Sequence, residues 1–507
     1  MNKTITLKAM IAGIPLQGPA ITPDLTLYGL TQNSQMVQPG GLFIAMPGLT
    51  QHGLNYIEEA VARGASAVFT EPDIEWPVDR IAALADRLTI PLYSGPTLYD
   101  HLSTLAQRYY GNPANHLSLI GVTGTNGKTS VTHYLAQVYE QLDPDSVGII
   151  GTLGNGRINA LQHTTHTTPE LFSLYAELAR QREAGIRHVM MEVSSHALAQ
   201  NRVAGLRYDT AILTNLTPEH QDYHGNMRSY GAAKAKLFRT PGLGHAVIQA
   251  DEGFGQQVIE QLTQETQVPI TTINTDPAAR PQSHTWIHAH QITTNPTGIQ
   301  IDLHTHAGTG RLESPLHGRF NAENLMLALG TLLAQQIPFD QAVAALAQVT
   351  GTPGRMTHRG TAGQPQVIID YAHTPDALEK ALQAAREHVS GRLISIFGCG
   401  GDRDANKRPL MGAIAERYAD QVWVTDDNPR TEPSTEISDQ ILAGMKCPAK
   451  VHLEHDRAKA ISTAIAEAKP QDVIVVAGKG HEKYQYIGME QRPFSDIEQV
   501  ELALRAY

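Results

Sequence analysis

The sequence is poor in cysteine: its 507 residues include only two, Cys399 and Cys447. Two cysteines cannot form a disulfide framework, and neither belongs to a CxxC pair with the spacing of a metal site. Such scarcity is typical of proteins from a reducing compartment. We therefore expect a cytoplasmic protein.

Long hydrophobic runs are also missing. A helix that crosses a bilayer needs about 20 apolar residues in succession, and no run in the sequence approaches that length. The apolar segment 472–478 is short and predicts a strand. The sequence has no repeat of fixed period, no heptad pattern and no low-complexity tract, which excludes solenoids, propellers and coiled coils. We expect no membrane insertion.

Positive charge is in deficit. The chain has 39 Lys and Arg against 50 Asp and Glu, a formal net charge of -11. Proteins that hold nucleic acid by its phosphates carry the opposite balance, so we expect no nucleic-acid partner. Apolar residues at 41% and charged residues at 18% are ordinary for a globular protein.

The sequence contains alternating short apolar strands and helices. At about 150 residues per domain, its length predicts about three domains. A helix over 97–110 marks one boundary, and a stretch rich in Gly, Thr and Pro over 350–366, followed by a strand over 367–369, marks another. Strands over 117–122 and 188–193, each followed by a helix, predict parallel sheets of the α/β class. The predicted domains are 1–96, 97–349 and 350–507.

The strongest local signal is a glycine-rich loop between an apolar strand and a helix, over 121–130. Glycines let backbone N–H groups converge on phosphate oxygens, a lysine can bridge the outer phosphates, and a hydroxyl can bind magnesium. The strict Walker A spacing would require glycine at Val122, so the loop is a variant, and an ordinary tight turn is the alternative. We interpret it as a phosphate-binding loop made by Gly124, Thr125, Asn126, Gly127, Lys128, Thr129 and Ser130.

Two further segments could contribute to a metal site. Glu192 closes an apolar strand of the same predicted sheet, where a magnesium-binding carboxylate is expected, although a loop-capping role fits the sequence alone equally well. The loop 214–224 is dense in histidine and acids, but no histidine there has the HExxH spacing of a zinc site. Lys234 and Lys236 lie in the next helix and by default would be solvated.

The C-terminal third repeats one theme, in which a short strand leads into a loop of functional side chains. In an open parallel sheet the carboxyl ends of the strands share one crevice, so we expect these loops to line a single site. Polar loops without a function are the alternative. The loops are 370–376, 398–404, 426–430 and 477–482.

Together these motifs resemble those of the Mur ligase family. The resemblance covers nearly the whole chain in the family's order and is carried by 124–129, 192–196, 317–324, 370–373 and 478–482. The Asp-Asn-Pro-Arg run over 427–430 is similar to that of the branch that adds meso-diaminopimelate.

The resemblance implies an α/β protein with an N-terminal UDP-binding domain, a central P-loop-type parallel-sheet ATPase domain and a Rossmann-like C-terminal domain. In the family, ATP phosphorylates the D-glutamate carboxylate of UDP-N-acetylmuramoyl-L-alanyl-D-glutamate, and the amine of meso-diaminopimelate attacks the acyl phosphate. The resemblance further implies small-molecule substrates only, ATP and Mg²⁺ as cofactors, carbon dioxide for a lysine carbamate, and a monomer that acts in peptidoglycan precursor synthesis.

The resemblance also implies roles for single residues. Catalysis would rest on Lys128, Glu192, His220 and Lys234, and magnesium on Thr129, Glu192, His220 and the carbamate of Lys234. Beyond the phosphate-binding loop, ATP would contact Asn321, Asn324, Asp370 and His373. The UDP-muramoyl dipeptide would contact Ser34, Leu49, Thr50, Gln51, His166, Thr167, Thr168, Ser194, Gln200 and Arg202. Diaminopimelate would contact Arg403, Asp427, Asn428, Arg430, Gly478 and Glu482.

The sequence departs from the family pattern at three places. Asn33 and Gln35 stand beside Ser34 where the family has Asp and Arg, so the UDP contact has fewer charges. Thr357 stands where an acid is usual. Lys236 adds a cation near Lys234, although residues two apart on a helix point to different faces.

Three alternatives stay open from sequence alone. The amino acid could be L-lysine, the acceptor could be that of a folylpolyglutamate or cyanophycin-type synthetase, or the chain could be a noncatalytic nucleotide-binding paralogue. The run over 428–430 and the loop around Ser34 favour the muramoyl acceptor. The intact set of Lys128, Thr129, Glu192 and Lys234 argues against a noncatalytic role.

Overall fold

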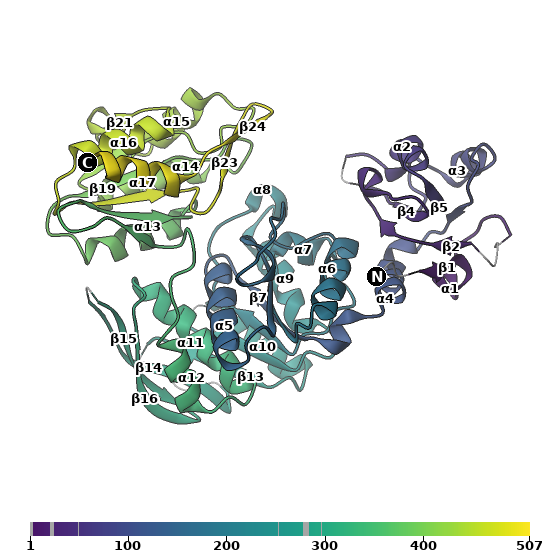
Figure 1. Cartoon of the computed structure of the whole chain (residues 1–507), viewed down its shortest axis with the longest axis horizontal. Coiled ribbons are helices and arrows are strands. Elements are labelled where there is room, and N and C mark those ends of the chain that lie inside the picture. The colour runs from purple at the N-terminus through teal and green to yellow at the C-terminus, as the bar shows by residue number, and fades with distance from the viewer. Residues whose placement is uncertain (1–3, 21–24, 49, 252, 277–282, 296) are drawn as a thin grey trace.

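The N-terminal part of the chain folds around a small parallel sheet (Figure 1). The structure is a computed structural model that describes residues 4–20, 25–48, 50–251, 253–276, 283–295 and 297–507. Neighbouring side chains of one strand, Phe43 and Ile44, enter the cores on opposite faces of the sheet, which explains why the whole strand is apolar. The strand order is β3-β4-β5-β6, and the elements are β1 (Ile5–Thr6), α1 (Leu7–Ile11), β2 (Thr26–Leu27), β3 (Leu30–Thr31), β4 (Gly41–Ala45), α2 (Ile57–Ala62), β5 (Ala65–Thr70), α3 (Val78–Ala85) and β6 (Leu92–Ser94).

The helix predicted at the first boundary is α4 (Leu98–Tyr110). It ends at Gly111, whose backbone has φ of 70°, a conformation that glycine adopts without the steric cost of a side chain. Its apolar stripe, which includes Leu102 and Leu105, is buried against α1 and α6 (Leu171–Glu183). α4 therefore joins the N-terminal part to the next part of the chain.

The central part is built on a ten-stranded sheet with the order β16-β15-β14-β13-β12-β11-β7-β10-β8-β9. The seven neighbouring strands β14, β13, β12, β11, β7, β10 and β8 are parallel to one another, as the alternating pattern predicts. The strands at the two edges, β9 on one side and β15 and β16 on the other, pair antiparallel. The antiparallel edge was not predicted. The strands are β7 (Ser118–Thr123), β8 (Val147–Gly151), β9 (Gly154–Arg157), β10 (His188–Glu192), β11 (Thr210–Leu213), β12 (His245–Gln249), β13 (Ile270–Asn274), β14 (Thr285–Asn295), β15 (Gly298–Thr305) and β16 (Gly308–Ser314).

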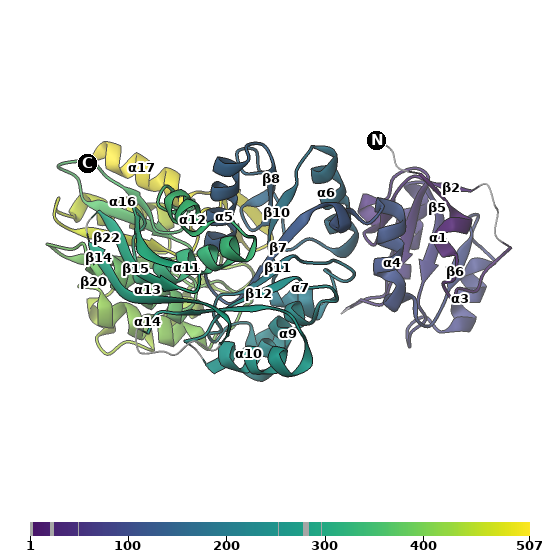
Figure 2. The same cartoon turned by 90° about the horizontal axis from the view of Figure 1, so that it is seen from below.

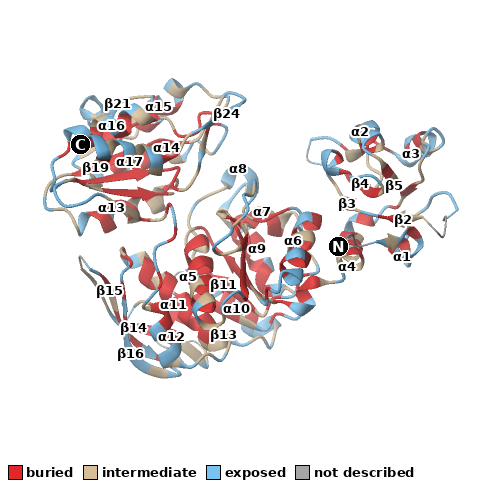
Figure 3. Ribbon diagram, in the orientation of Figure 1, coloured by how far each residue is buried: buried red, intermediate tan, exposed pale blue. Residues whose placement is uncertain are grey.

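Both faces of the central sheet are covered by helices (Figure 3). In β7, Leu119 and Ile120 are fully buried in different cores, one on each side. One core contains α5 (Lys128–Leu142), α11 (Arg319–Ala334) and α12 (Phe339–Leu346), and the other contains α6. The remaining helices are α7 (Ser195–Ala199), α8 (Gln221–His224), α9 (Met227–Ala235) and α10 (Gly253–Glu265).

The C-terminal part contains a six-stranded sheet with the order β17-β18-β22-β19-β20-β21. All strands are parallel except β17, which pairs antiparallel with β18 and was not predicted. The elements are β17 (Thr357–Arg359), β18 (Gln366–Asp370), α13 (Pro375–Arg386), β19 (Leu393–Phe397), α14 (Lys407–Tyr418), β20 (Gln421–Val424), α15 (Ser434–Leu442), β21 (His452–Leu453), α16 (Arg457–Glu467), β22 (Val473–Ala477), β23 (Tyr484–Ile487), β24 (Glu490–Pro493) and α17 (Asp496–Ala506).

The three parts are arranged with the N-terminal part at one end of the molecule (Figures 1 and 2). The C-terminal part lies over the side of the central part that carries α5 and α8 (Figure 1). Both cysteines are free, Cys399 buried and Cys447 exposed. Among the described residues, no helix is long and apolar enough to cross a membrane.

A buried ion pair supports the C-terminal sheet. Arg457 and Asp496 are both fully buried, and Nε and Nη2 of the arginine lie 2.7 and 2.8 Å from the two carboxylate oxygens. Removing one partner of such a pair leaves an uncompensated charge and costs about 3–5 kcal/mol. We expect Arg457→Leu to destabilise the C-terminal part by that amount, measured by hydrogen exchange of β19 and β22 peptides against urea.

The matched control for this prediction is Arg492→Leu. Arg492 pairs with Glu490 at the surface, where ion pairs contribute little because water screens them. Equal protection of β19 and β22 in the two variants would contradict the structural role of Arg457.

Candidate functional site

The glycine-rich loop connects β7 to α5, as predicted. Gly124 and Gly127 have φ of 145° and 87°, and a side chain at Gly124 would overlap the Thr214 hydroxyl. The backbone of the loop is therefore free to approach a ligand at the N-terminus of α5. Lys128 Nζ donates to the carbonyls of Gly124 and Thr125 at 2.9 and 2.7 Å. Burial lowers the pKa of Lys128, and the carboxylates of Glu219 and Glu192 act in the opposite direction.

Thr129 and Glu192 meet beside this loop. Because β7 and β10 are parallel neighbours, the carboxylate that follows β10 lies next to the first turn of α5. Thr129 Oγ1 donates to Glu192 Oε2 at 3.0 Å, and the backbone N–H of Thr152 donates to Glu192 Oε1 at 2.8 Å. Hydroxyl and carboxylate oxygens are the ligands that Mg²⁺ prefers.

A second cluster faces the other side of the loop and contains Lys234, His220 and Glu219. Lys234, which by default would be solvated, is 1% exposed, and its Nζ donates to the carbonyl of Gly124 at 2.7 Å. Burial, and then the nearby charge of Lys128, lower the pKa of Lys234 well below its ordinary value. Burial also lowers the pKa of His220, to about 4. A lowered pKa favours the neutral, nucleophilic amine of Lys234 over the ammonium.

Glu219 is the charged group that this cluster shares with the C-terminal part. Its two carboxylate oxygens lie 3.1 Å from His373 Nε2 and 3.5 Å from His220 Nε2. Burial alone would raise the pKa of Glu219, but the hydrogen bond from His373 and the charges of His220 and Lys128 hold it well below its ordinary range. Among the described residues, no three His, Cys, Asp or Glu side chains converge as a metal cage, so a metal here would also need ligands from phosphates or water.

Several of the residues predicted for the nucleotide line a cavity of about 70 Å³ at the junction with the C-terminal part, but His373, which contacts Glu219, does not. Asn324 and Asp370 line it together with Asn126, Thr129 and Ser130. Asn321 lies behind it, where its Oδ1 accepts from Tyr134 Oη and from Asn324 Nδ2. Two contacts close the junction: Asn126 Nδ2 donates to Asp376 Oδ2 at 2.9 Å, and Arg355 Nη2 to Thr129 Oγ1 at 3.3 Å.

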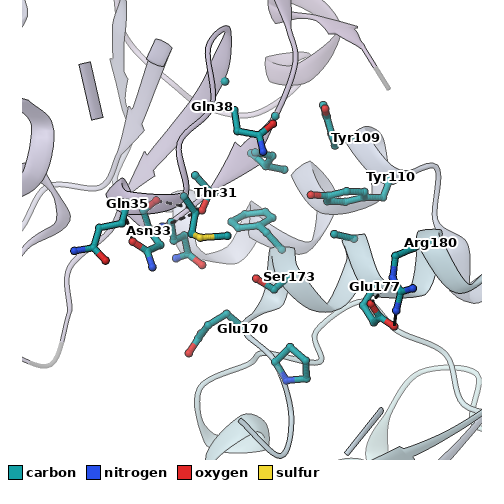
Figure 4. Close-up of a pocket in the computed structure, with 18 of the residues that line it drawn as sticks. Thr31, Asn33, Gln35, Gln38, Tyr109, Tyr110, Glu170, Ser173, Glu177 and Arg180 are labelled. Atoms are coloured by element: carbon teal, nitrogen blue, oxygen red, sulfur yellow. Dashed lines mark hydrogen bonds and ion pairs between the residues drawn. The ribbon is translucent and has the colours of Figure 1, made fainter. Parts of the chain in front are cut away.

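A larger cavity, of about 1160 Å³, lies between the N-terminal and central parts (Figure 4). Thr31, Asn33 and Gln35 approach it from one side, and Glu170 and Arg180 from the other (Figure 4). The predicted residues that line it are Ser34 and His166, and those that sequence reasoning missed include Tyr28, Tyr56, Tyr109, Tyr110 and Phe172.

The other residues predicted for the muramoyl dipeptide do not line this cavity. Thr168, Ser194 and Arg202 form a hydrogen-bonded group beside Glu192, since Thr168 Oγ1 donates to the Glu192 carbonyl and Arg202 Nη1 to the Thr168 carbonyl. This group contacts Glu192 through Thr168, and it contacts the large cavity through Arg202, whose Nη2 lies 2.9 Å from Oε1 of the cavity residue Glu170. Thr167 accepts a hydrogen bond from Thr152, and Gln200 accepts one from Arg202. Gln51, next to Thr50 in the chain, accepts one from Tyr56, a residue that lines the large cavity. Leu49 lies outside the described residues.

The loops after β18, β22, β19 and β20 lie along one edge of the C-terminal sheet, as predicted. Asn428 Nδ2 donates to Glu482 Oε2 at 3.1 Å, and Arg430 Nη1 to the Gly401 carbonyl at 2.6 Å. A side chain at Gly478 would meet Asp427 Oδ2 at 2.8 Å, so glycine is needed there for close approach. Burial lowers the pKa of Arg430, and the charge of the exposed Arg403 nearby lowers it further. Such paired arginines fit a carboxylate.

Comparison with known proteins covers all three parts of the chain. The model of the Mur ligase middle domain matches residues 122–332, that of the Mur ligase glutamate ligase domain 354–480, and that of the Mur ligase family catalytic domain 26–99. The chain belongs to the Mur ligase family. Two proteins named UDP-N-acetylmuramoyl-L-alanyl-D-glutamate--2,6-diaminopimelate ligase, from Pseudomonas aeruginosa and Ectopseudomonas mendocina, are 47% and 46% identical to it over 96% of this chain and 97% of theirs.

Solved structures agree with the assignment to the Mur ligase family. A structure of UDP-N-acetylmuramoyl-L-alanyl-D-glutamate--2,6-diaminopimelate ligase superposes with a TM-score of 0.68 at 32% identity, over 99% of both chains. MurF from Acinetobacter baumannii shares the fold, with a TM-score of 0.66 at 17% identity over 100% of both chains. The α/β fold and the family predicted from the sequence are therefore confirmed.

Sequence reasoning missed three charged or aromatic groups at the centre of this Mur ligase: Glu219, Arg355 and Tyr371. Arg355 lies over the Tyr371 ring, with its guanidinium carbon 4.4 Å from the ring centroid, and Tyr371 Oη donates to Glu482 Oε1 at 3.4 Å. With the bond from Arg355 to Thr129, these contacts connect the phosphate loop to the C-terminal loops. The available signal was that Glu219 and Tyr371 lie within the noted loops 214–224 and 370–376, and Arg355 within the stretch 350–366, although the pattern assigned none of them a role.

Proposed function

We propose that this Mur ligase joins meso-diaminopimelate to the D-glutamate of UDP-N-acetylmuramoyl-L-alanyl-D-glutamate at the expense of ATP. The observation that carries the proposal is the 46–47% identity, over 96% of the chain, to proteins named as ligases of these two substrates. The geometry supports it, because the chain has a phosphate-type loop and a cavity large enough for a nucleotide sugar, and Arg355 and Tyr371 connect that loop to the C-terminal loops.

The proposed reaction has two steps. The D-glutamate carboxylate attacks the γ-phosphorus of ATP and releases ADP; the amine then attacks the acyl phosphate and releases phosphate. Lys128 neutralises charge as the two anions approach, and it acts in a buried site where electrostatic interactions are strong. The contacts of Asp376 and Arg355 with the phosphate loop hold the parts together and exclude water from the acyl phosphate.

We assign magnesium to the oxygens of Thr129 and Glu192, and a second magnesium to His220 and a carbamate on Lys234. Magnesium in these positions would neutralise phosphate charge during transfer. The carbamate forms when the neutral Lys234 amine attacks the carbon of carbon dioxide and loses a proton, which turns a cation into an oxygen ligand. The burial of Lys234 favours the neutral amine that this step requires.

We assign the other predicted residues by position. Asn321, Asn324, Asp370 and His373 would contact the nucleotide, the large cavity would hold the UDP-muramoyl moiety, and the Thr168–Ser194–Arg202 group would hold the dipeptide near the γ-phosphate. The division into 1–96, 97–349 and 350–507, a monomeric state and a cytoplasmic location belong to the same proposal.

The function is tested by a ligation assay with ATP, Mg²⁺ and the UDP-muramoyl dipeptide, in which phosphate release and product mass are both read. We expect tripeptide with meso-diaminopimelate and little with L-lysine. Tripeptide with lysine alone would overturn the assigned amino acid, and absence of ligation by folded protein supplied with carbon dioxide would overturn the function.

Arg430 is the residue on which we expect amino-acid preference to depend most. Diaminopimelate differs from lysine by one distal carboxylate, which an arginine fork can bind with two hydrogen bonds. Charge-assisted hydrogen bonds of this kind contribute about 1.5–3 kcal/mol. We therefore expect Arg430→Leu to raise the KM for diaminopimelate by about 10- to 100-fold, with the KM for ATP unchanged, in the same assay.

The control for Arg430→Leu is Arg417→Leu, which removes an arginine stacked on Tyr418 on the same part of the chain, away from the pocket. An unchanged preference for diaminopimelate over lysine in Arg430→Leu would contradict the assigned pocket.

A further inference from the structure

Lys479 is a fully buried lysine within the loop 477–482, one of the loops assigned to the amino-acid pocket. Its Nζ donates to Asn428 Oδ1 at 3.0 Å and to Glu482 Oε2 at 2.9 Å, and it lies 3.8 Å from Asp427 Oδ1. A lysine ammonium has three N–H donors; two of them are bonded to Asn428 and Glu482, and the Asp427 carboxylate pairs with the ammonium by charge at a distance too long for a hydrogen bond. Because its side chain is fully buried, Lys479 would act on a ligand only through the residues that it holds.

The contact with Asn428 fixes the orientation of an amide. Asn428 Oδ1 accepts from two donors, Lys479 Nζ and the backbone N–H of Tyr486, each at 3.0 Å. A reversed amide would place its NH₂ group against both donors. Asn428 is therefore held with its nitrogen toward Glu482.

This orientation makes Asn428 a hydrogen-bond donor toward a ligand. An amide nitrogen carries two hydrogens, and among the described residues only Glu482 accepts one of them, at 3.1 Å. The second hydrogen is left for an acceptor such as a carboxylate oxygen. Asn428 with a reversed amide would instead present a carbonyl, which repels a carboxylate.

Lys479 also compensates charge in the pocket. Asp427 is buried and Glu482 is half-buried, both carboxylates pair with Lys479, and Glu482 also accepts from Asn428 and Tyr371. Without the ammonium, the negative charges of Asp427 and Glu482 would be less well neutralised. They would then repel each other and any carboxylate of a ligand more strongly. Loss of the Lys479 ammonium would therefore weaken binding of an amino acid with two carboxylates more than binding of one with a single carboxylate.

We propose that Lys479 is a positioning residue that holds Asn428 as a donor and thereby favours an amino acid with a distal carboxylate over one without it. The inference rests on the proposed function and goes beyond it by adding a residue that sets amino-acid preference without touching the amino acid. It also explains why a lysine is buried in this loop, where its removal from water must be repaid by specific contacts.

The test compares wild type with Lys479→Met, a substitution of similar length without charge. We expect the KM for meso-diaminopimelate to rise about tenfold, the size expected for one charge-assisted hydrogen bond. The KM for L-lysine, for ATP and for the UDP-muramoyl dipeptide should stay within about twofold. The ratio of kcat/KM between the two amino acids therefore falls about tenfold. A purely structural role would raise the KM for both amino acids alike, and that result would overturn the inference.

Two further variants complete the design. Asn428→Asp keeps an oxygen that can accept from Lys479 and Tyr486 but removes the amide N–H that could donate to a ligand. This variant should therefore lose the preference for diaminopimelate over lysine even if Lys479→Met folds poorly. The double variant should lose no more than the larger single loss, because the two residues act in series. Additive losses would overturn the inference. Lys459→Met, an exposed lysine in the same part of the chain, is the matched control.

The wild-type arm separates this inference from the function on which it rests. Tripeptide formed by wild type, with equal losses for both amino acids in Lys479→Met, overturns the role of Lys479 alone. No tripeptide from wild type with either amino acid overturns the proposed function and this inference with it.

Discussion

Lys128→Met is expected to abolish ligation, with kcat lowered by at least about 1000-fold, the upper range for loss of one group that stabilises charge in a transition state. The substitution keeps the length of the side chain and removes its charge. Lys128 lies at the first turn of α5, its Nζ already within the phosphate loop at the carbonyls of Gly124 and Thr125. In the proposed reaction two anions must meet there, and no solvent charge replaces the ammonium in a buried site.

The measurement for Lys128→Met is ADP formation in the presence of all three substrates, with Lys236→Met as the control. Lys236 is an exposed lysine of the central part that donates to the Leu198 carbonyl, and it should tolerate the substitution. Activity of Lys128→Met within tenfold of wild type would contradict the role of the loop. Binding of the UDP-muramoyl dipeptide should be retained, because the large cavity does not include Lys128.

Lys234→Ala is expected to lose at least about 100-fold in kcat, and wild-type activity is expected to depend on carbon dioxide. An unmodified Lys234 offers magnesium no oxygen, and in its ammonium form it would repel the metal, whereas a carbamate supplies the oxygen ligand that magnesium requires. Removing the side chain leaves space at Gly124 and Glu219 in which a small carboxylic acid can take the place of the carbamate.

Three observations check the carbamate. Wild type depleted of carbon dioxide should regain activity on addition of bicarbonate, labelled carbon dioxide should give a carbamate signal in carbon NMR, and formate or acetate should partly restore Lys234→Ala but not Lys128→Met. Full activity without carbon dioxide, together with no carbamate signal, would contradict the modification and leave Lys234 as an amine.

The parts of the site that depend on local chemistry were predictable from the sequence. The phosphate loop requires positive φ at Gly124 and Gly127, and glycine spacing reveals that requirement. Glu192 follows from its place at the end of an apolar strand, since parallel strands bring their carboxyl ends together. The same rule placed the four loops of the C-terminal sheet at one edge.

The parts that depend on contacts between distant segments were not predictable. Arg355 reaches Thr129 across 226 residues of sequence, and Glu219 reaches His373 across 154. Nothing in the local pattern distinguishes Lys479, which is buried, from an ordinary loop lysine. The antiparallel strands β15 and β16 were missed because the repeated strand-and-helix pattern stops before them.

The large cavity shows the same limit on a larger scale. Its walls come from the N-terminal part, from α4 and from α6, so no single segment carries its pattern. The motif around Ser34 identified one wall, and Tyr28, Tyr109 and Phe172 became visible only when the two parts were placed together. Aromatic side chains at such a junction supply flat surfaces on which a base or sugar can pack.

The central claim is that ATP activates the D-glutamate carboxylate as an acyl phosphate in this site. The most direct test uses UDP-muramoyl dipeptide whose D-glutamate side-chain carboxylate carries heavy oxygen, with ATP, Mg²⁺ and meso-diaminopimelate. The carboxylate oxygen that attacks phosphorus stays with phosphate when the amine displaces it. The account predicts one heavy oxygen atom in each phosphate released. Unlabelled phosphate, formed together with tripeptide, would contradict it.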